Sequence, residues 1–524
     1  MRKVLMQSTS QTLGVDQPTK SVHRLVDSQW IGHAWFTASG ALVAELTTGD
    51  DLIDLLRRSA RWPGTLFLDS ATGSFPRASV METDPAAGLL DRYSFLAVDP
   101  FEWLVIDREK NDAAALVENA IAAHRSPTIP GLPPFQGGVA GLLAYDFGLI
   151  SVGVNPPKDH IASIPLVVLG SYDVVFAVDH VRGRGWMISQ GLPALGPVER
   201  RRRALWRAAQ VLDRLQASDY VRVQKTFCWP PAVSQPLQGH ESIAASCSRN
   251  QHLEKVRQTI EKIRDGDVFQ VNLAQTLAAK GVFDPVELYL RLREENAAPF
   301  AGYFDCGDDL QVASASPERF LQVVRSGVRM HPIKGTRRII ERPEADLFAA
   351  GDLESSAKDR AENVMIVDLV RNDLSKVCMA ESVTVEVLCR LERYRYVQHL
   401  VSVVSGRLRQ GLGPLDAVRE AVPGGSVTGA PKQRACEIIS ELEQLNRGAY
   451  CGSLGYVGFD GVSDWNLLIR TFTVNAGYLW FAVGGGITAA SDPSAEYDET
   501  LDKAEGMIRA LAVESRAEMT GRAQ

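Results

Sequence analysis

The sequence lacks paired cysteines and long apolar segments. Its seven cysteines are scattered over 524 residues without a CxxC pair, which excludes a disulfide scaffold and suits reduced thiols. No stretch reaches 18 consecutive apolar residues, and the first fourteen residues hold no apolar run long enough for a secretory signal. We therefore expect a cytoplasmic protein that does not enter a membrane.

An excess of positive charge is also absent. The chain has 56 Lys and Arg against 63 Asp and Glu, a formal net charge of −7. This balance gives no electrostatic footprint for nucleic acid or for an anionic membrane surface. GxSxG, GxCxG, GxxxxGK[ST] and GxGxxG patterns are missing as well, so we expect no hydrolase triad, no Walker loop and no dinucleotide site. Because no nucleophile pattern of this kind is present, we also expect no glutaminase activity within the chain.

The composition is that of a globular protein, with 45% hydrophobic and 23% charged residues. Residues 1–40 are rich in Ser, Thr, Gln and Gly without periodicity, and they predict a flexible leader. Residues 41–225 mix short strands with helices, which indicates an α/β or α+β region. Three prolines near 229–239 predict a connection over 226–250. The chemically suggestive residues follow, in a region from 251 to 517.

Regular elements are expected where apolar residues recur at strand or helix spacing. The expected strands are 65–68, 166–169, 268–273, 466–471 and 478–483, and the expected helices are 50–59, 197–216, 253–263 and one after Pro431.

Two acidic pairs stand at helical spacing, Asp359 with Glu362 and Glu496 with Glu499. Residues three apart share one helix face, so each pair can project two carboxylates toward one point. Four such oxygen ligands would suit Mg²⁺. A solvated acidic surface near a helix start is the plain alternative.

Two glycine-rich segments could bind an anion through bare backbone amides. One is 422–432, VPGGSVTGAPK, just before a helix, and the other is 484–486, GGG, after a strand. Ordinary turns are the alternative in both places.

Three basic or titratable side chains lie among apolar neighbours. Arg470 needs an anionic partner if it is buried. Lys334 would need desolvation or a cationic neighbour to act as a nucleophile, because an ordinary lysine is almost fully protonated at neutral pH. For His399, a hydrogen-bonded core histidine is the alternative to a functional role.

Taken in order, these segments closely resemble the chorismate-utilising family that contains anthranilate synthase and aminodeoxychorismate synthase component I. The resemblance is strong over 250–515 and weaker before it. The matching blocks are GDVFQVNLAQ (266–275), SPERF (316–320), PIKGTRR (332–338), AENVMIVDLVRND (361–373), PGGSVTGAPK (423–432), CGSLGYVGFDG (451–461), LLIRT (467–471), GGGI (484–487) and EYDETLDKA (496–504).

The resemblance implies a Mg²⁺ ion that holds a carboxylate of chorismate. The ligands would be chiefly Glu362 and Glu499, supported by Asp359 and Glu496. The other residues that it assigns to the substrate are Thr428, Tyr456, Arg470, Gly485 and Gly486, with His399 near the departing C4 hydroxyl.

Glu318 corresponds to the family's general acid, which protonates the C4 hydroxyl so that it leaves as water. This role needs a carboxyl that keeps its proton near neutral pH. We therefore predict a raised pKa from burial and neighbouring carboxylates.

Lys334 separates the two branches of the family, because relatives that make anthranilate resemble PIAGT here and those that make aminodeoxychorismate resemble PIKGT. The resemblance implies that the Lys334 amine adds at C2 and that ammonia then enters at C4 and expels it. The product would be 4-amino-4-deoxychorismate, the precursor of 4-aminobenzoate for folate. The ammonia would come from a separate glutamine amidotransferase subunit.

The fold implied by the resemblance is α+β, with two layered antiparallel β-sheet halves wrapped by helices, as in anthranilate synthase component I. The LFLDS and RYS segments correspond to a tryptophan pocket in relatives. Ser70 could touch tryptophan there, and a serine at the edge of the core is an equally good reading.

Three other functions remain open at this point. Anthranilate synthase component I is disfavoured by Lys334, and an isochorismate or salicylate synthase would need no amine donor. A non-catalytic regulatory subunit that binds chorismate or tryptophan would have no need of both Glu318 and Lys334.

Overall fold

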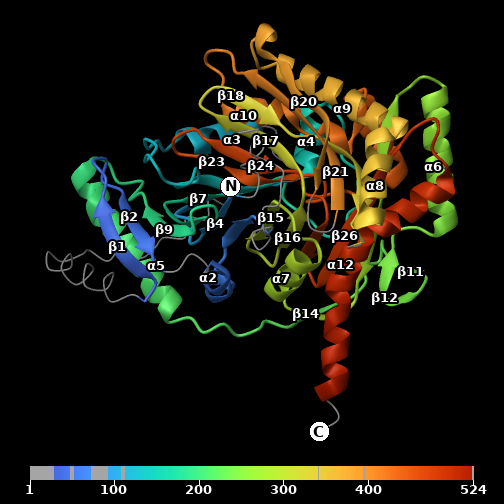
Figure 1. Cartoon of the computed structure of the whole chain (residues 1–524). Coiled ribbons are helices and arrows are strands. Elements are labelled where there is room, and N and C mark those ends of the chain that lie inside the picture. Colours follow the sequence, from blue (N-terminus) through green and yellow to red (C-terminus); the bar gives the residue numbers. More distant parts are fainter. Residues whose placement is uncertain are drawn as a thin grey trace.

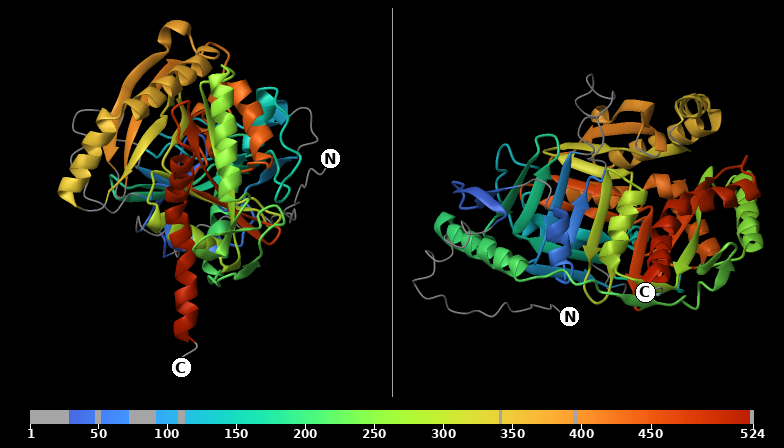
Figure 2. Two further views of the ribbon diagram at one scale, coloured as in Figure 1. Left: turned by 90° about the vertical axis from the view of Figure 1, so that its right-hand side faces the viewer. Right: turned by 60° about the horizontal axis from the view of Figure 1, so that its bottom comes forward.

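Two antiparallel β-sheets lie face to face at the centre of the molecule (Figures 1 and 2). The structure is a computed structural model of the whole chain, and it describes residues 29–47, 52–71, 92–107, 113–339, 342–393 and 397–521. Every statement below refers to these residues. The mixture of antiparallel sheets and helices confirms the predicted α+β fold.

The larger sheet has fourteen strands in the described residues. Their order is β1 (Ile31–Phe36), β2 (Leu42–Leu46), β9 (Arg184–Ser189), β8 (Val174–Asp179), β4 (Tyr93–Ala97), β3 (Leu66–Asp69), β15 (Phe300–Asp305), β16 (Gln311–Ser316), β25 (Thr471–Asn475), β26 (Tyr478–Ile487), β13 (Gln270–Ala279), β12 (His240–Ala245) and β11 (Gln235–Leu237), with β22 (Gly429–Ala430) paired to β13.

The smaller sheet has ten strands in the same part of the chain. Their order is β19 (Ile333–Arg338), β21 (Val397–Arg407), β18 (Gly327–Met330), β17 (Arg319–Val324), β24 (Ser463–Asn466), β23 (Ser453–Gly458), β6 (Gly138–Leu143), β7 (Val167–Tyr172) and β5 (Glu102–Ile106), with β20 (Thr384–Arg393) paired to β21. A separate pair joins β10 (Lys225–Phe227) to β14 (Gly281–Phe283).

Buried apolar side chains from both sheets, such as Phe304 and Leu454, form the core between them. Helices cover the outer faces, because each sheet has a second apolar face to bury. On the larger sheet these are α2 (Leu52–Ser59), α5 (Pro197–Gln216), α7 (Pro285–Glu295) and α12 (Pro493–Gly521). On the smaller sheet they are α3 (Ala113–Ala122), α4 (Tyr145–Ser151), α9 (Ala357–Ser375) and α10 (Pro414–Ala421). Two more, α6 (Arg249–Arg264) and α11 (Lys432–Glu443), share a core with β13, and α8 (Pro343–Ser355) precedes α9.

The two regions predicted from the sequence, 41–225 and 251–517, contribute strands to the same sheets. β3 pairs with β15 in the larger sheet, and β6 pairs with β23 in the smaller one. The regions are therefore interleaved in the sheets, and neither has a sheet of its own.

The structure differs from the sequence prediction at both expected irregular segments. Of the predicted leader, residues 1–28 lie outside the described residues, while Ile31–Phe36 forms β1 at the edge of the larger sheet. The predicted connection, 226–250, contains β11 and β12. Pro236 is tolerated there because β11 is an edge strand, where a missing N–H breaks no inner ladder.

The chain passes between the two sheets at two neighbouring places. Residues 317–318 connect β16 of the larger sheet to β17 of the smaller one, and residues 467–470 connect β24 to β25 in the opposite direction. The strand expected over 466–471 is thus interrupted here. The two crossings touch, since the Leu467 amide donates to the Glu318 carbonyl at 3.1 Å. Glu318 and Arg470 therefore lie together where the backbone leaves regular pairing.

A search of the described residues found no helix both long and apolar enough to cross a bilayer.

Candidate active site

Glu318 lies in the crossing between β16 and β17 and is only 4% exposed. Its Oε1 accepts a 2.7 Å hydrogen bond from the Ser426 hydroxyl. Burial raises the pKa of the Glu318 carboxyl to about 7, although Ser426, Lys334 and the Ile333 amide each pull it down. The direction of this shift agrees with the one expected for a general acid, and of the two expected causes burial acts here while no neighbouring carboxylate of the described residues contributes.

Lys334 lies on β19, and its Nζ donates a 2.8 Å hydrogen bond to the Ser426 carbonyl. Burial lowers the pKa of this amine. The Lys503 ammonium lowers it further, whereas the carboxylates of Glu362, Glu318 and Glu499 act in the opposite direction. Lys334 and Glu318 therefore meet at a single residue, Ser426, and burial makes the Lys334 amine easier to deprotonate than a free lysine.

His399 is 1% exposed and lies on β21, opposite Thr336 of β19. Burial, helped by the nearby Arg470 cation, lowers the pKa of His399 to about 3. The ring is therefore neutral at physiological pH, and its hydrogen bond with the Gly335 backbone ties it to the strand that carries Lys334.

Arg470 has a backbone φ of 53°, in the left-handed region that side chains rarely adopt. Burial lowers its pKa to about 10, and within the described residues no carboxylate forms an ion pair with its guanidinium. A desolvated guanidinium is stabilised by an anion. Arg470 is thus the basic side chain of this site that is ready to receive a carboxylate.

The two acidic pairs come from different helices, and Glu362 of the first pair and both members of the second approach the same strand, β26. A β-carbon on Gly485 would lie 3.3 Å from Glu496 Oε2 and 3.5 Å from Glu499 Oε1, and one on Gly486 would lie 3.5 Å from Glu362 Oε2. Glycine at these positions lets α9 and α12 bring carboxylates close to the backbone. Gly485 and Gly486 are therefore neighbours of Glu362, Glu496 and Glu499.

Basic side chains partner these carboxylates. Asp359 pairs with Arg337 at 3.1 Å, Glu496 with Lys358 at 3.3 Å and Glu499 with Lys503 at 2.7 Å. Burial raises the pKa of Glu362, the charges of Lys334 and Lys358 act to lower it, and those of Asp359 and Glu499 act to raise it. Among the described residues, no three His, Cys, Asp or Glu side chains are gathered closely enough to hold a metal ion together. Glu362 and Glu499 are the two carboxylates whose mutual repulsion a cation would relieve.

Thr428 belongs to the loop over 424–430, which covers Glu318. Its hydroxyl donates to the Gly424 carbonyl at 2.9 Å, so it holds the loop closed. Arg447 clamps the same loop to β13 by donating to the carbonyls of Val427 at 2.8 Å and Asn272 at 2.7 Å. Gly429 must be glycine, because its φ is 143° and a β-carbon there would lie 2.1 Å from the Gln270 carbonyl oxygen.

Tyr456 and Ser70 lie in different surroundings from these residues. The Tyr456 ring stacks on Phe135 at 4.3 Å in the core between the sheets. The Ser70 hydroxyl donates to the Pro299 carbonyl at 3.2 Å. Tyr456 therefore shows no contact with Glu318 or Lys334, and tryptophan binding beside Ser70 stays a prediction.

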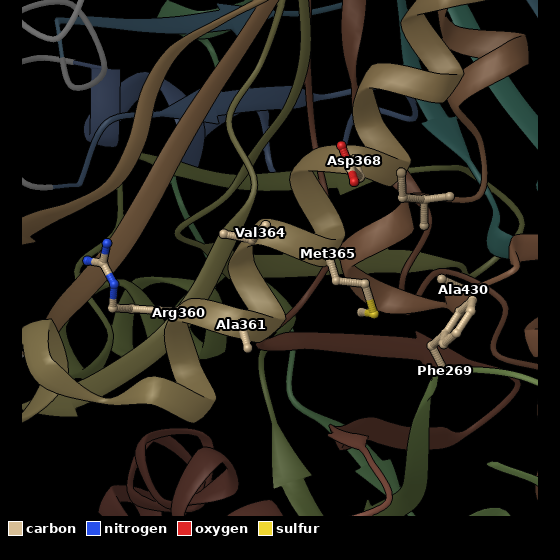
Figure 3. A pocket seen from close by; sticks show the side chains of 8 residues that line it. Phe269, Arg360, Ala361, Val364, Met365, Asp368 and Ala430 are labelled. Atoms are coloured by element: carbon tan, nitrogen blue, oxygen red, sulfur yellow. The ribbon is translucent and has the colours of Figure 1, made fainter. Parts of the chain in front are cut away.

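An open, mainly apolar hollow of about 600 Å³ lies against the outer side of α9 (Figure 3). Arg360, Val364 and Asp368 line it, and the first two point away from Glu362 because residues two apart occupy nearly opposite sides of a helix. Phe269, which is 72% exposed, and Ala430 form the facing wall. None of the predicted site residues lines this hollow.

Three polar residues that the structure brings to the site were not singled out from the sequence. Ser426 stands inside the quoted PGGSVTGAPK block, but nothing in that block distinguishes its hydroxyl from that of Thr428. Lys503 could have been found, since a lysine four residues after Glu499 on a helix predicts an ion pair. Lys358 carries no such signal, because its partner, Glu496, lies on another helix.

The sequence and the fold were compared with those of known proteins. A family model described as chorismate binding enzyme matches residues 67–509, which is most of the chain.

Two relatives illustrate the similarity. Aminodeoxychorismate synthase component 1 of Klebsiella aerogenes is 39% identical over 454 residues, covering 86% of this chain and 94% of the relative. Anthranilate synthase component 1 of Streptomyces coelicolor is 35% identical over 436 residues, covering 82% of this chain and 83% of the relative. The chain is therefore similar to members of both branches.

Solved structures agree with the fold. The crystal structure of anthranilate synthase component I from Streptococcus pneumoniae superimposes with a TM-score of 0.67 at 29% identity, covering 83% of this chain and 95% of that one. MenF, the menaquinone-specific isochorismate synthase of Escherichia coli, superimposes with a TM-score of 0.66 at 15% identity, which shows the shared fold alone.

Proposed function

The chain belongs to the family of chorismate-binding enzymes, and on this basis we propose that it is an aminodeoxychorismate synthase component I. The observation that carries the proposal is the meeting of Glu318 and Lys334 at Ser426. A buried acid that keeps its proton near pH 7 and a desolvated amine are the two groups that an amine-adding substitution requires.

In the proposed reaction, the neutral Lys334 amine forms a bond to C2 of chorismate while the C4–O bond breaks. Glu318 gives its proton to the departing oxygen, which leaves as water. Ammonia then bonds to C4, the bond between C2 and the lysine nitrogen breaks to return the free amine, and the proton that the new C4 amine loses returns to Glu318. The sum is chorismate plus ammonia giving 4-amino-4-deoxychorismate plus water, the step toward 4-aminobenzoate and folate.

Arg470 and a Mg²⁺ ion are the proposed anchors for the substrate's carboxylates. The guanidinium offers a bidentate site without a competing carboxylate. Glu362 and Glu499 would hold the ion, with Asp359 and Glu496 at its edge, and the bound ion would neutralise a substrate carboxylate. Neutral His399 lies between Gly335 and Arg470, where it can hydrogen-bond the departing hydroxyl without adding charge.

We propose that the ammonia comes from a glutamine amidotransferase subunit. The relatives named above are component 1 proteins, and this name implies a second component. Such a partner would supply ammonia from outside the chain.

Product analysis tests the proposal. The purified chain is incubated with chorismate, Mg²⁺ and an ammonium salt, and the products are separated and identified by mass. We expect 4-amino-4-deoxychorismate. Anthranilate as the product would assign the chain to the other branch, to which the Streptomyces coelicolor relative belongs. Isochorismate as the product would show that the reaction uses no amine donor.

The variant Lys334→Ala probes the residue on which the branch depends. We expect it to abolish formation of 4-amino-4-deoxychorismate. Unchanged turnover would refute the covalent role of Lys334, and a switch to anthranilate would show that this side chain decides where the amine enters.

A further inference from the structure

Ser426 touches both reacting groups of the proposed mechanism. Its hydroxyl donates to Glu318 Oε1 at 2.7 Å, and its carbonyl accepts from Lys334 Nζ at 2.8 Å. The residue is 7% exposed and lies in the 3-10 turn Gly425–Val427. A buried hydroxyl at this distance makes a directed contact, since water does not compete for it.

The turn that carries Ser426 is held from three directions. Thr428 donates to the Gly424 carbonyl, and Arg447 donates to the Val427 carbonyl. A β-carbon on Gly425 would lie 2.7 Å from Leu369 Cδ2, so α9 packs directly against the turn. These contacts fix the backbone of the turn and therefore the position of the Ser426 hydroxyl.

The other groups that face Glu318 are few. Lys334 approaches from β19, the Ile333 amide comes from the same strand, and Cys451 lies on the side of β23. Burial raises the pKa of Cys451 to about 12, so this thiol is neutral. Lys334 is thus the one basic group among them, it acts to lower the pKa of the Glu318 carboxyl, and its amine is itself bound by the Ser426 carbonyl.

We propose that Ser426 is a positioning residue, which fixes the Glu318 carboxyl with its acid proton on Oε2 and holds the Lys334 amine beside it. The proposal rests on the function proposed above. With Oε1 engaged by the serine O–H, the proton of the neutral carboxyl is carried by Oε2 and is the one transferred to the departing oxygen. The same O–H then stabilises the carboxylate that is left behind.

The variant Ser426→Ala tests this role through the carboxyl itself. At neutral pH most carboxyls are ionised, so the infrared C=O band of a protonated carboxyl is assigned to Glu318 by its loss in Glu318→Gln. We expect the titration midpoint of this band to rise in Ser426→Ala and the band to move to higher frequency, because a hydrogen bond to the carboxyl is lost. Ser426→Thr, which keeps the hydroxyl, should restore both.

Kinetics provide the second measurement. We expect kcat with ammonium to fall by about tenfold in Ser426→Ala, the size of one hydrogen bond to a charged group. The alkaline limb of kcat/KM should move to higher pH, since that limb reports the acid of the free enzyme. A purely structural defect would lower the rate equally at every pH.

Ser440→Ala is the matched control, because Ser440 lies on α11 and its buried hydroxyl has no hydrogen-bond partner in the part of the chain that the structure describes. Unchanged midpoint and band position in Ser426→Ala would overturn the proposal, as would equal shifts in Ser440→Ala. The infrared measurement needs no substrate. If wild type makes no 4-amino-4-deoxychorismate while the band shifts as expected, the proposed reaction fails and the contact between Ser426 and Glu318 stands.

Discussion

Lys503 Nζ lies 2.7 Å from Glu499 Oε1, one turn further along α12. Although burial of Glu499 acts to raise its pKa, the charge and hydrogen bond of Lys503, together with the charges of Lys358 and Lys334, outweigh this effect and lower it. Glu499 is thus ionised and already partnered by a cation. A divalent ion that binds Glu499 must displace this ammonium or share the carboxylate with it.

The first prediction concerns this competition. Lys503→Met should lower the Mg²⁺ concentration that gives half-maximal activity, because the competing cation is removed, and Glu499→Gln should raise it by about tenfold or more. Titration of activity with Mg²⁺ measures both. Asp502→Asn, on the exposed side of α12, is the control and should leave the titration unchanged. An identical Mg²⁺ requirement in Glu499→Gln would exclude this carboxylate as a ligand.

The second prediction concerns the Lys334 amine. When chorismate and Mg²⁺ are supplied without ammonia, the chain should gain the mass of one chorismate minus one water, because the amine adds and the hydroxyl leaves. Rapid acid quenching followed by intact-protein mass spectrometry detects this adduct. Lys334→Arg keeps a long basic side chain but has no nucleophilic amine, so it should show no added mass. An adduct of the same mass in Lys334→Arg would place the bond on another residue.

Much of the fold and of the site could be predicted from the sequence. The helix expected over 197–216 is α5, because its apolar spacing and its first-turn proline are local signals. The acidic pairs lie on helices, as their spacing requires, and Glu318 has a pKa shifted in the expected direction. These features depend on short-range pattern or on burial.

The remainder depends on how distant segments meet. The apolar run around 467–469 has the composition of a strand, yet the chain there changes sheets and Arg470 adopts a positive φ. Tyr456 lies within a block that resembles the family's substrate site, but strand alternation turns its ring toward Phe135 between the sheets. Ser426 gains its importance only when the turn closes over Glu318, a contact across 108 residues of sequence.

The third prediction uses the titration of Glu318. The folded state raises its pKa from 4.5 to about 7, so it binds the proton more tightly than the unfolded chain does. The contribution of Glu318 to the free energy of unfolding is therefore fully present below about pH 4.5. It is lost as pH rises through 7, by about 3 kcal/mol in total. Glu318→Gln has no such titration. Its free energy of unfolding should rise relative to wild type by about this amount between about pH 4 and pH 8.

Denaturant unfolding at several pH values measures this difference. Glu254→Gln, an exposed substitution on α6, is the comparison. Activity should be lost in Glu318→Gln even where stability is gained, since the acid proton is removed. A stability difference between Glu318→Gln and wild type that does not change with pH would refute the raised pKa.

The fourth prediction separates two arginines that belong to the two neighbouring crossings between the sheets, Arg470 at the end of one and Arg319 directly after the other. Arg470 has no carboxylate partner, whereas Arg319 donates to Asp464 at 3.0 and 2.9 Å. Arg470→Gln should raise KM for chorismate by about a hundredfold with little loss of stability, because it removes an anion site and an uncompensated charge. Arg319→Gln should lower the melting temperature, since it leaves Asp464 unpaired. Steady-state kinetics and thermal unfolding distinguish the two, and an unchanged KM in Arg470→Gln would remove Arg470 from the substrate site.

The fifth prediction concerns the close approach of β26 to α9. A β-carbon on Gly486 would lie 2.0 Å from Gln270 Nε2 and 3.5 Å from Glu362 Oε2. The first contact requires Gln270 to move, which is affordable for the end of a side chain, so Gly486→Ala should cost about 1–2 kcal/mol of stability. The added methyl would also reach the carboxylate proposed to bind the ion. We therefore expect activity to fall by more than tenfold, with an increased Mg²⁺ requirement.

Gly351→Ala is the matched control for this substitution. Gly351 lies in α8 with nothing within 4 Å of an added β-carbon, so alanine there should leave activity unchanged and raise stability slightly through helix propensity. If Gly486→Ala loses stability and activity in proportion, the effect is one of folding alone. If activity falls while the melting temperature is nearly unchanged, glycine is required at 486 because a side chain there would displace the Glu362 carboxylate.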